Sequence, residues 1–186
     1  MQNHLYYSPT EFKSKFHKSN ICCIFGGSFD PIHEGHIRDI RTLLDLSSTV
    51  IIAPTAQNPW KPDQSSALRT RLEMIELVLN AEGISFTKNL NNIGLILSDL
   101  EYHFSIELDK AVKQERDSIY PSESIYWAIG EDLRDSAHKW KDWDHEGSDF
   151  LVLPTLEGFS GTAVRNQKLD PHPAISQFIK NHRLYN

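Results

Sequence analysis

Two histidines three residues apart, His33 and His36, follow a turn that begins with the glycine pair Gly26-Gly27. Glycines carry no side chain, so the backbone N–H groups of such a turn can approach an anion closely. Residues 21–25 before the turn have the composition of a buried strand, and residues 37–46 after it carry apolar side chains at helical spacing. A strand, a glycine turn and a helix start together form a phosphate cradle, because the helix N-terminus carries partial positive charge. The pattern predicts phosphate chemistry beside the two histidines.

The turn is specified at many positions at once. It reads Gly26-Gly27-Ser28-Phe29-Asp30-Pro31-Ile32-His33-Glu34-Gly35-His36. The dipeptide Asp30-Pro31 favours a turn, and Gly35 permits a close approach of the backbone. An ordinary turn with two surface histidines would not require these residues together, so we favour the functional interpretation. The sequence contains neither a G-x-G-x-x-G dinucleotide fingerprint nor a G-x-x-x-x-G-K-[ST] P-loop.

This segment resembles the signature of the nucleotidyltransferases with an H-x-G-H motif, and its GGSFDP form is most similar to that of the bacterial nicotinate-nucleotide adenylyltransferases. The resemblance implies catalytic roles for His33 and His36. It also implies that ATP phosphates bind to the turn residues Gly26, Gly27, Ser28 and Phe29. The resemblance extends from about residue 21 to the end of the chain, where PAISQFIKNHRLY is similar to the closing helix of the family.

A second segment that could bind phosphate is FSGTAVR, residues 159–165. Ser160 and Thr162 are typical of a helix start and can offer hydroxyl groups to an anion. Arg165 could form bidentate hydrogen bonds to phosphate oxygens. A plain helix cap with a solvated arginine is the alternative. The segment resembles the I-S-S-T-x-I-R triphosphate motif of the family, with Gly161 in place of the second serine. We therefore expect triphosphate binding, weakened by the missing hydroxyl, and a catalytic role for Arg165.

The segment at residues 130–143 is the candidate for binding the second substrate. It resembles the G-x-D and K-W-x-x-W stretch with which the family holds the nicotinate nucleotide, which implies pyridine-nucleotide binding by Asp132 and Trp140. An indole ring can stack on a pyridine ring. The alternative is that Trp140 and Trp143 are core anchors of a loop or helix.

Two weaker matches complete the candidate site. The segment NPWKP resembles the P-P-H-K loop of the family, with Trp60 in place of histidine, and its Lys61 could neutralise phosphate charge. A solvated loop lysine is the alternative. The segment YHFSIEL resembles S-Y-T-x-D-T-L only in part, since Phe104 and Ser105 keep an aromatic ring and a hydroxyl for the pyridine nucleotide. In the family this segment faces the base of the substrate, so its departures leave the identity of that base the least defined part of the prediction.

Composition indicates a globular protein. The chain has 186 residues, of which 39% are hydrophobic and 24% are charged, which suffices for one well-packed domain. The net charge of −6 argues against a broad nucleic-acid-binding face. Cys22 and Cys23 are adjacent and would project to opposite faces of a strand, so they predict free thiols in a reducing compartment. With no membrane-length apolar run and no signal-peptide pattern, we expect a cytoplasmic protein.

Strands and helices alternate along the chain. Apolar runs predict strands at 21–25, 50–53, 124–129 and 150–153, and helices at 37–46, 66–80, 104–112, 160–167 and 172–182. This alternation predicts an α/β fold with a doubly wound, mainly parallel sheet, which is Rossmann-like. Each candidate segment except YHFSIEL follows a predicted strand, where such sheets bind ligands. We expect residues 1–20 to be an N-terminal extension with a short helix from Ser8, and residues 21–186 to be a single nucleotidyltransferase domain.

The resemblance implies an adenylyl transfer in NAD biosynthesis. The 5′-phosphate of nicotinate mononucleotide would attack the α-phosphorus of ATP, giving deamido-NAD and pyrophosphate, with Mg²⁺ as the cofactor bridging phosphates. The implied partners are ATP and nicotinate mononucleotide, and we expect no binding to nucleic acid or membrane. The sequence leaves open whether the protein forms a homo-oligomer. Other acceptors (nicotinamide mononucleotide, phosphopantetheine), cytidylyl transfer and a catalytically silent nucleotide-binding regulator are the alternatives. A class I aminoacyl-tRNA synthetase shares H-x-G-H, but the chain lacks K-M-S-K-S.

Overall fold

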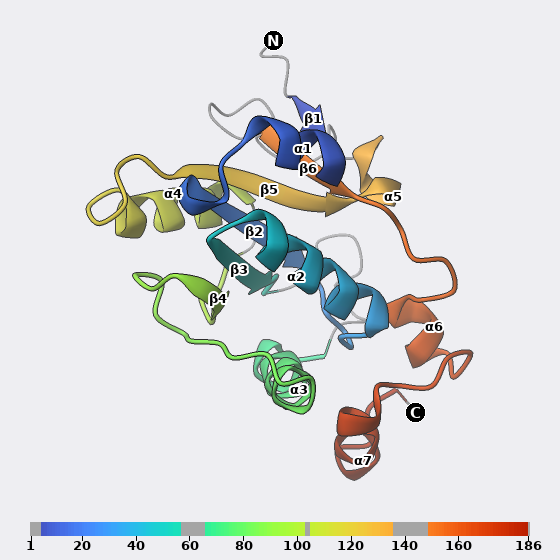
Figure 1. Ribbon diagram of the computed structural model, residues 1–186. Coiled ribbons are helices and arrows are strands. Elements are labelled where there is room, and N and C mark those ends of the chain that lie inside the picture. The colour runs from blue at the N-terminus through green and yellow to red at the C-terminus, as the bar shows by residue number, and fades with distance from the viewer. Residues whose placement is uncertain (1–4, 57–65, 103–104, 136–148, 186) are drawn as a thin grey trace.

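The sheet is parallel and doubly wound, as the alternation of elements predicted. The computed structural model describes residues 5–56, 66–102, 105–135 and 149–185 (Figure 1). Within these ranges one sheet of 6 strands has the order β1-β6-β5-β2-β3-β4, and all of its pairings are parallel. The strands are β1 (Tyr6–Tyr7), β2 (Ile21–Gly27), β3 (Thr49–Pro54), β4 (Gly94–Leu97), β5 (Ser124–Gly130) and β6 (Asp149–Leu153).

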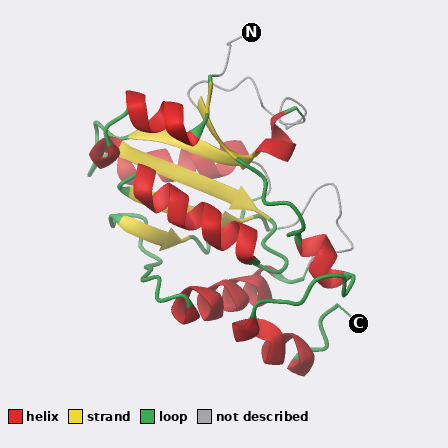
Figure 2. Ribbon diagram, turned by 45° about the vertical axis from the view of Figure 1, so that its right-hand side comes forward, coloured by secondary structure: helices red, strands yellow, loops and turns green. Residues whose placement is uncertain are grey.

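Helices lie on both faces of this sheet (Figure 2). They are α1 (Pro9–Lys15), α2 (Glu34–Leu46), α3 (Leu68–Ala81), α4 (Ser105–Arg116), α5 (Glu131–Arg134), α6 (Gly161–Arg165) and α7 (Pro173–Asn181), with a 3₁₀ turn at Lys18–Asn20. Residues of α1, α2, α3 and α7 share one hydrophobic cluster with one face of the sheet, and α4 packs in a second cluster on the other face. Cys23 belongs to the first cluster and Cys22 to the second, so the predicted opposite orientation of the two free thiols is confirmed.

The strand order defines where a ligand would bind. From β2 the sheet continues through β3 and β4 on one side, and through β5 and β6 on the other. This reversal makes the carboxyl end of β2 a topological switch point, the usual position of a ligand crevice in open α/β sheets. The glycine turn occupies that end, since Gly26 and Gly27 pair in register with Ala53 and Pro54 of β3.

Residues 5–20 pack against the sheet through β1 and α1. The predicted helix start at Ser8 is confirmed, because its hydroxyl and the Glu11 carboxylate form a reciprocal capping box on α1. Phe12 is buried beside Tyr7 and Tyr126, with ring centroids 6.1 Å and 4.8 Å away. The sequence did not predict β1, which pairs with β6 at the sheet edge, or β4 at the opposite edge.

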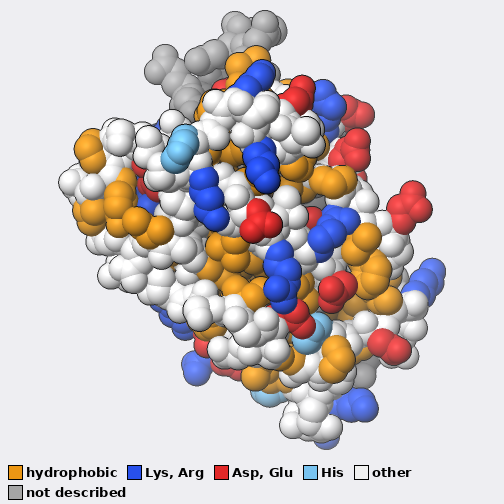
Figure 3. All heavy atoms as spheres, in the orientation of Figure 1, with side chains coloured by type: hydrophobic (Ala, Val, Ile, Leu, Met, Phe, Trp, Pro, Cys, Tyr) orange, Lys and Arg blue, Asp and Glu red, His pale blue; other side chains and the backbone are white. Residues whose placement is uncertain are grey.

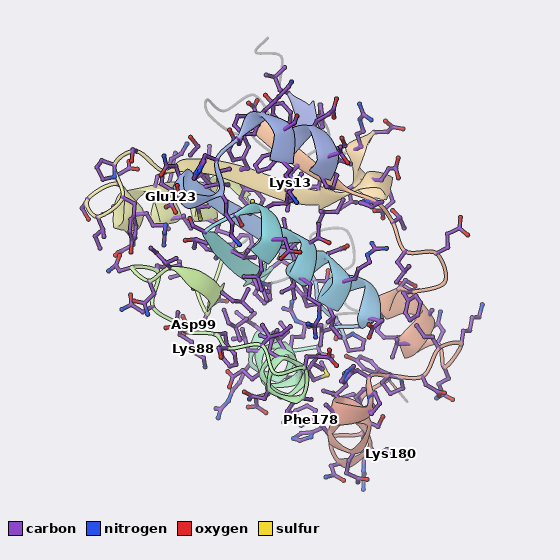
Figure 4. The ribbon with its side chains drawn as sticks, viewed as in Figure 1. Lys13, Lys88, Asp99, Glu123, Phe178 and Lys180 are labelled. Atoms are coloured by element: carbon purple, nitrogen blue, oxygen red, sulfur yellow. The ribbon has the colours of Figure 1, made fainter. Side chains whose placement is uncertain are left out.

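Charge is mixed on the face shown in Figure 3, and one ion pair is buried in the interior. Figure 3 shows one face, on which basic and acidic side chains are interspersed among apolar ones. Buried Arg116 forms an ion pair with Glu123, with 2.5 Å between Nε and Oε2, at the end of the sheet opposite to α6 (Figure 4). Figure 4 also places Phe178 of α7 towards α3, with which α7 is in contact. None of the helices in the described ranges is long and apolar enough to cross a membrane.

Candidate functional site

The two glycines of the turn are required by the rings packed behind them. A Cβ atom at Gly26 would lie 3.0 Å from the Trp127 ring and 3.3 Å from the Tyr102 hydroxyl. One at Gly27 would lie 3.2 Å from the Phe29 ring. Trp127 and Tyr102 are themselves fixed, since their Nε1–H and O–H groups donate to Asp109 and to the Ala53 carbonyl. The glycine turn therefore rests on a rigid aromatic support.

Phe29, a predicted phosphate-binding residue, has its side chain in the core. Its ring is 1% exposed and contacts Phe25 edge-on, with the centroids 5.4 Å apart. Its φ of 48° is in the left-handed region, which bulky residues rarely adopt and which turns the chain sharply at this point. Only the backbone of Phe29 is therefore available to an anion, while the ring holds the turn in place.

His33 and His36 stand together at the start of α2. Their rings are stacked, with centroids 3.8 Å apart and planes inclined by 27°. The His33 backbone N–H donates to His36 Nδ1 over 3.3 Å, so the proton of the neutral His36 ring is on Nε2. Removal from water lowers the pKa of His33 to about 4 and, together with the neighbouring His33, lowers the pKa of His36 well below its usual value. Both rings are neutral at pH 7 and can donate N–H hydrogen bonds without introducing charge.

The ring of His33 is held by a close contact rather than by a hydrogen bond at Nδ1. A Cβ atom at Gly35 would lie 3.1 Å from His33 Nδ1 and Cε1, so a glycine at position 35 allows the ring to lie against the helix backbone. The buried Nδ1 atom has no hydrogen-bond partner among the described residues. Buried polar atoms are usually paired, and exceptions concentrate at functional sites.

The second predicted phosphate segment lies directly beside the turn. Arg165 on α6 donates from Nη1 to the Asp30 carbonyl oxygen, 135 residues away in the sequence, and from Nη2 to Thr162 Oγ1 over 3.0 Å. The Ser160 hydroxyl accepts the Ala163 N–H over 3.0 Å and thus caps α6. The hydroxyl protons of Ser160 and Thr162 and the remaining guanidinium N–H groups are the donors that this segment can offer to phosphate.

Sequence reasoning missed Arg71, which holds three loops of this edge together. It is 0% exposed and donates to four carbonyl oxygens, those of Ser28, Thr55, Ala56 and Ser66, over 2.6 to 2.9 Å. Burial lowers the pKa of Arg71, but an arginine stays charged at any working pH. The sequence did contain a signal for a buried arginine. Arg71 lies three and four residues before Met74 and Ile75, which places a charged residue on the apolar face of α3.

The acceptor-binding candidates are described only in part. Asp132 lies on α5 directly after β5, and its Oδ1 occupies the space that a Cβ atom at Gly130 would need, which accounts for the G-x-D spacing. Burial raises the pKa of Asp39 on α2, and the nearby charge of Asp132 adds to the effect. Trp140, Lys61 and Phe104 lie outside the described residues, as does the side chain of Ser105, although Ser105 begins α4. In the described part of the chain, no three His, Cys, Asp or Glu side chains are grouped as metal ligands.

Comparison with known proteins adds to this geometry. A sequence model of the cytidylyltransferase-like family matches residues 24–167. A protein of Leptospira interrogans named "Probable nicotinate-nucleotide adenylyltransferase" is 35% identical over 150 residues, which cover 79% of this chain and 71% of the relative. The chain belongs to the nicotinate-nucleotide adenylyltransferase family. A relative of the same name from Methylacidiphilum infernorum is 29% identical over 194 residues, covering 87% of this chain and 90% of its own length.

Solved structures agree on the fold of this adenylyltransferase. The Plasmodium falciparum nicotinic acid mononucleotide adenylyltransferase complexed with NaAD superimposes with a TM-score of 0.68. The alignment covers 91% of this chain and 98% of the other at 19% identity. At that identity the likeness supports the Rossmann-like fold and says nothing about individual residues.

One departure of this adenylyltransferase from the family pattern has a reason in packing. Gly161 replaces the second serine of the triphosphate motif, and a Cβ atom there would lie 2.8 Å from the Asp30 carbonyl oxygen. It would also lie 3.3 Å from Arg165 Nη1. The glycine thus lets α6 approach the turn closely enough for Arg165 to bond Asp30. Whether the missing hydroxyl weakens phosphate binding stays a prediction.

Proposed function

We propose that this chain transfers the adenylyl group of ATP to the 5′-phosphate of nicotinate mononucleotide. A phosphate oxygen of the mononucleotide attacks the α-phosphorus, the bond to the bridging oxygen breaks, and deamido-NAD and pyrophosphate form. The observation that carries the proposal is that the turn at the switch point of the sheet holds the stacked pair His33 and His36 and also, through the Asp30 carbonyl, binds Arg165. Membership of the nicotinate-nucleotide adenylyltransferase family supports the choice of substrates.

Catalysis in this proposal consists of positioning and electrostatic stabilisation. The attacking group belongs to the substrate, so the protein supplies no nucleophile. His33 and His36 donate N–H hydrogen bonds to oxygens of the transferring phosphate, and each positioned donor contributes about 100-fold or more to the rate. Since both rings are neutral, they stabilise charge as it develops without binding the ground-state anion as strongly as a cation would.

The leaving pyrophosphate is assigned to the other side of the site. Arg165 binds the β- and γ-phosphates through its free N–H groups, assisted by the hydroxyls of Ser160 and Thr162, and the backbone of residues 26–29 lies along the phosphate chain. Mg²⁺, which the family resemblance implies, would enter with ATP and would supply positive charge to the leaving pyrophosphate. The described side chains assigned to this side of the site, those of Ser160, Thr162 and Arg165, are hydrogen-bond donors to phosphate and include no carboxylate.

The acceptor is assigned to the segment after β5. Asp132, at the start of α5, and Trp140 further along hold the nicotinate nucleotide in this proposal. The sequence candidates Phe104 and Ser105 face its base, and Lys61 neutralises phosphate charge. These assignments rest on the motif resemblance, with Asp132 alone among them having a described side chain at the carboxyl edge of the sheet.

A histidine substitution tests the proposal. We expect His36→Ala to lower the turnover of pyrophosphate release, measured with ATP, Mg²⁺ and nicotinate mononucleotide, by about 100-fold or more. His17→Ala is the matched control, because His17 is exposed, bonds Ser19 and precedes β2 at the opposite end of the sheet. The control should retain turnover within about twofold. Near wild-type turnover of the His36→Ala variant would overturn the assigned mechanism.

A further inference from the structure

The last described residue of the chain reaches back to the phosphate-binding turn. The hydroxyl of Tyr185 donates to Asp30 Oδ1 over 2.5 Å, although the two residues are 155 positions apart. The other carboxylate oxygen of Asp30 accepts the Ser66 N–H over 2.9 Å, and Asp30 is only 3% exposed. This carboxylate therefore connects the C-terminal segment, the loop before α3 and the turn.

Tyr185 is held firmly in this position. Its ring packs against the main hydrophobic cluster, and its hydroxyl lies 4.0 Å from Met74 Sδ and 3.5 Å from Ser66 Oγ. Its φ of 64° lies in the left-handed region, which is strained for a tyrosine and persists only where surrounding contacts enforce it. Burial, followed by the hydrogen bond to Asp30, raises the pKa of Tyr185, so the hydroxyl stays a donor at working pH.

Asp30 also positions Arg165 through a different atom. Its carbonyl oxygen accepts the Arg165 Nη1–H, and the same oxygen is the atom that Gly161 approaches most closely. The carboxylate of Asp30 thus fixes the turn, while its carbonyl fixes the guanidinium relative to His33 and His36. Since Asp30 is buried and both of its carboxylate oxygens are bonded, these bonds help to anchor the backbone of the residue and with it the carbonyl that Arg165 contacts.

We propose that Tyr185 is a positioning residue for ATP, which acts by holding Asp30 so that the Asp30 carbonyl keeps Arg165 at the triphosphate. Tyr185 does not contact the substrate in this arrangement. The inference rests on the proposed function for the identity of the phosphate ligand. If Tyr185 only secured the C-terminus, its loss would lower thermal stability and leave nucleotide binding unchanged.

Removal of the hydroxyl alone provides the first test. We expect Tyr185→Phe to weaken binding of α,β-methylene-ATP with Mg²⁺, measured by calorimetry, by about tenfold, the scale of one hydrogen bond to a charged group. Tyr120→Phe is the matched control, since it removes a tyrosine hydroxyl that donates to the Asn91 carbonyl over 3.2 Å, next to the buried Arg116–Glu123 pair. Binding by Tyr185→Phe that equals the control overturns the proposal, whatever the melting temperatures.

A double-mutant cycle tests whether the effect passes through Arg165. In an Arg165→Ala background, Tyr185→Phe should weaken analogue binding by less than twofold, because the group that it positions is gone. The same tenfold loss in both backgrounds would contradict the proposed route. Both measurements report binding without turnover, so they decide the role of Tyr185 even if the wild-type protein proves inactive with nicotinate mononucleotide, which would count only against the proposed function.

Discussion

Gly161→Ser offers a test in which the structure and the motif lead to opposite expectations. The substitution restores the serine that the triphosphate motif of the family carries, so the motif alone predicts tighter ATP binding. In the structure the new Cβ atom would lie 2.8 Å from the Asp30 carbonyl oxygen, whereas ordinary contacts of a Cβ atom begin near 3.4 Å. The carbonyl is a backbone atom in a tightly held turn, so α6 and the turn have to separate by a few tenths of an ångström.

The expected change in the free energy of unfolding for Gly161→Ser is the balance of two opposing effects. Overpacking of this kind costs about 1–3 kcal/mol, and replacing glycine in a helix regains at most about 1 kcal/mol. The net loss of about 1–2 kcal/mol corresponds to a fall in melting temperature of about 2–8 °C for a chain of this length. The separation also weakens the bond from Arg165 to Asp30, for which we expect kcat/KM for ATP to fall about tenfold, equivalent to about 1.4 kcal/mol.

The assay combines differential scanning fluorimetry with the kinetics of pyrophosphate release. Gly161→Ala is the informative companion variant, because it adds the Cβ atom without a hydroxyl and should lose nearly as much as Gly161→Ser. If Gly161→Ser instead raises the melting temperature or improves kcat/KM for ATP, the close approach of α6 to the turn does not constrain this position. A loss confined to the serine variant would assign the effect to the hydroxyl and refute the packing argument.

Two further predictions concern the histidines and one concerns Arg71. Because the pKa values of His33 and His36 are lowered, their ring resonances in NMR should not titrate between pH 5.5 and 8; a midpoint near 6.5 for either ring would contradict the assignment. The same shifts mean that the unfolded state binds more protons, so the free energy of unfolding, measured in urea, should fall as pH drops from 6.5 towards 4, and a rise over that range would refute the burial of these rings. Arg71→Met removes donors from four carbonyls and should lower the free energy of unfolding by about 3–5 kcal/mol, whereas the matched Arg69→Met, whose side chain is 91% exposed, should cost less than about 0.5 kcal/mol. A loss below about 1 kcal/mol for Arg71→Met would show that these loops do not depend on it.

The strand, turn and helix of the candidate site were predictable because their signals are local. The apolar run before Gly26 and the helical spacing from Ile37 gave the strand, turn and helix in the order observed, and the alternation of such units gave the parallel sheet. The edge strands β1 and β4 were not predicted. At 2 and 4 residues they are too short for a clear periodic signal, and β1 forms through its pairing with β6.

The contacts that assemble the candidate site were not predictable, because the partner residues are distant in sequence. Arg71 stands where a helix pattern expects an apolar side chain, and only the fold brings four carbonyl oxygens around it. The contact between Tyr185 and Asp30 spans nearly the whole chain. Phe29 is part of the sequence motif, but its ring lies in the core that supports the turn and is not exposed to a ligand.

The most direct test of the central claim is a comparison of acceptors with the purified protein. Pyrophosphate release is measured with ATP and Mg²⁺ in the presence of nicotinate mononucleotide, nicotinamide mononucleotide or 4′-phosphopantetheine, and with CTP in place of ATP, and the products are identified by mass. The account predicts turnover with ATP and nicotinate mononucleotide, with deamido-NAD as the product and a higher kcat/KM than for any other pair. No pyrophosphate release with this pair, or a higher kcat/KM with a different acceptor or with CTP, would contradict it.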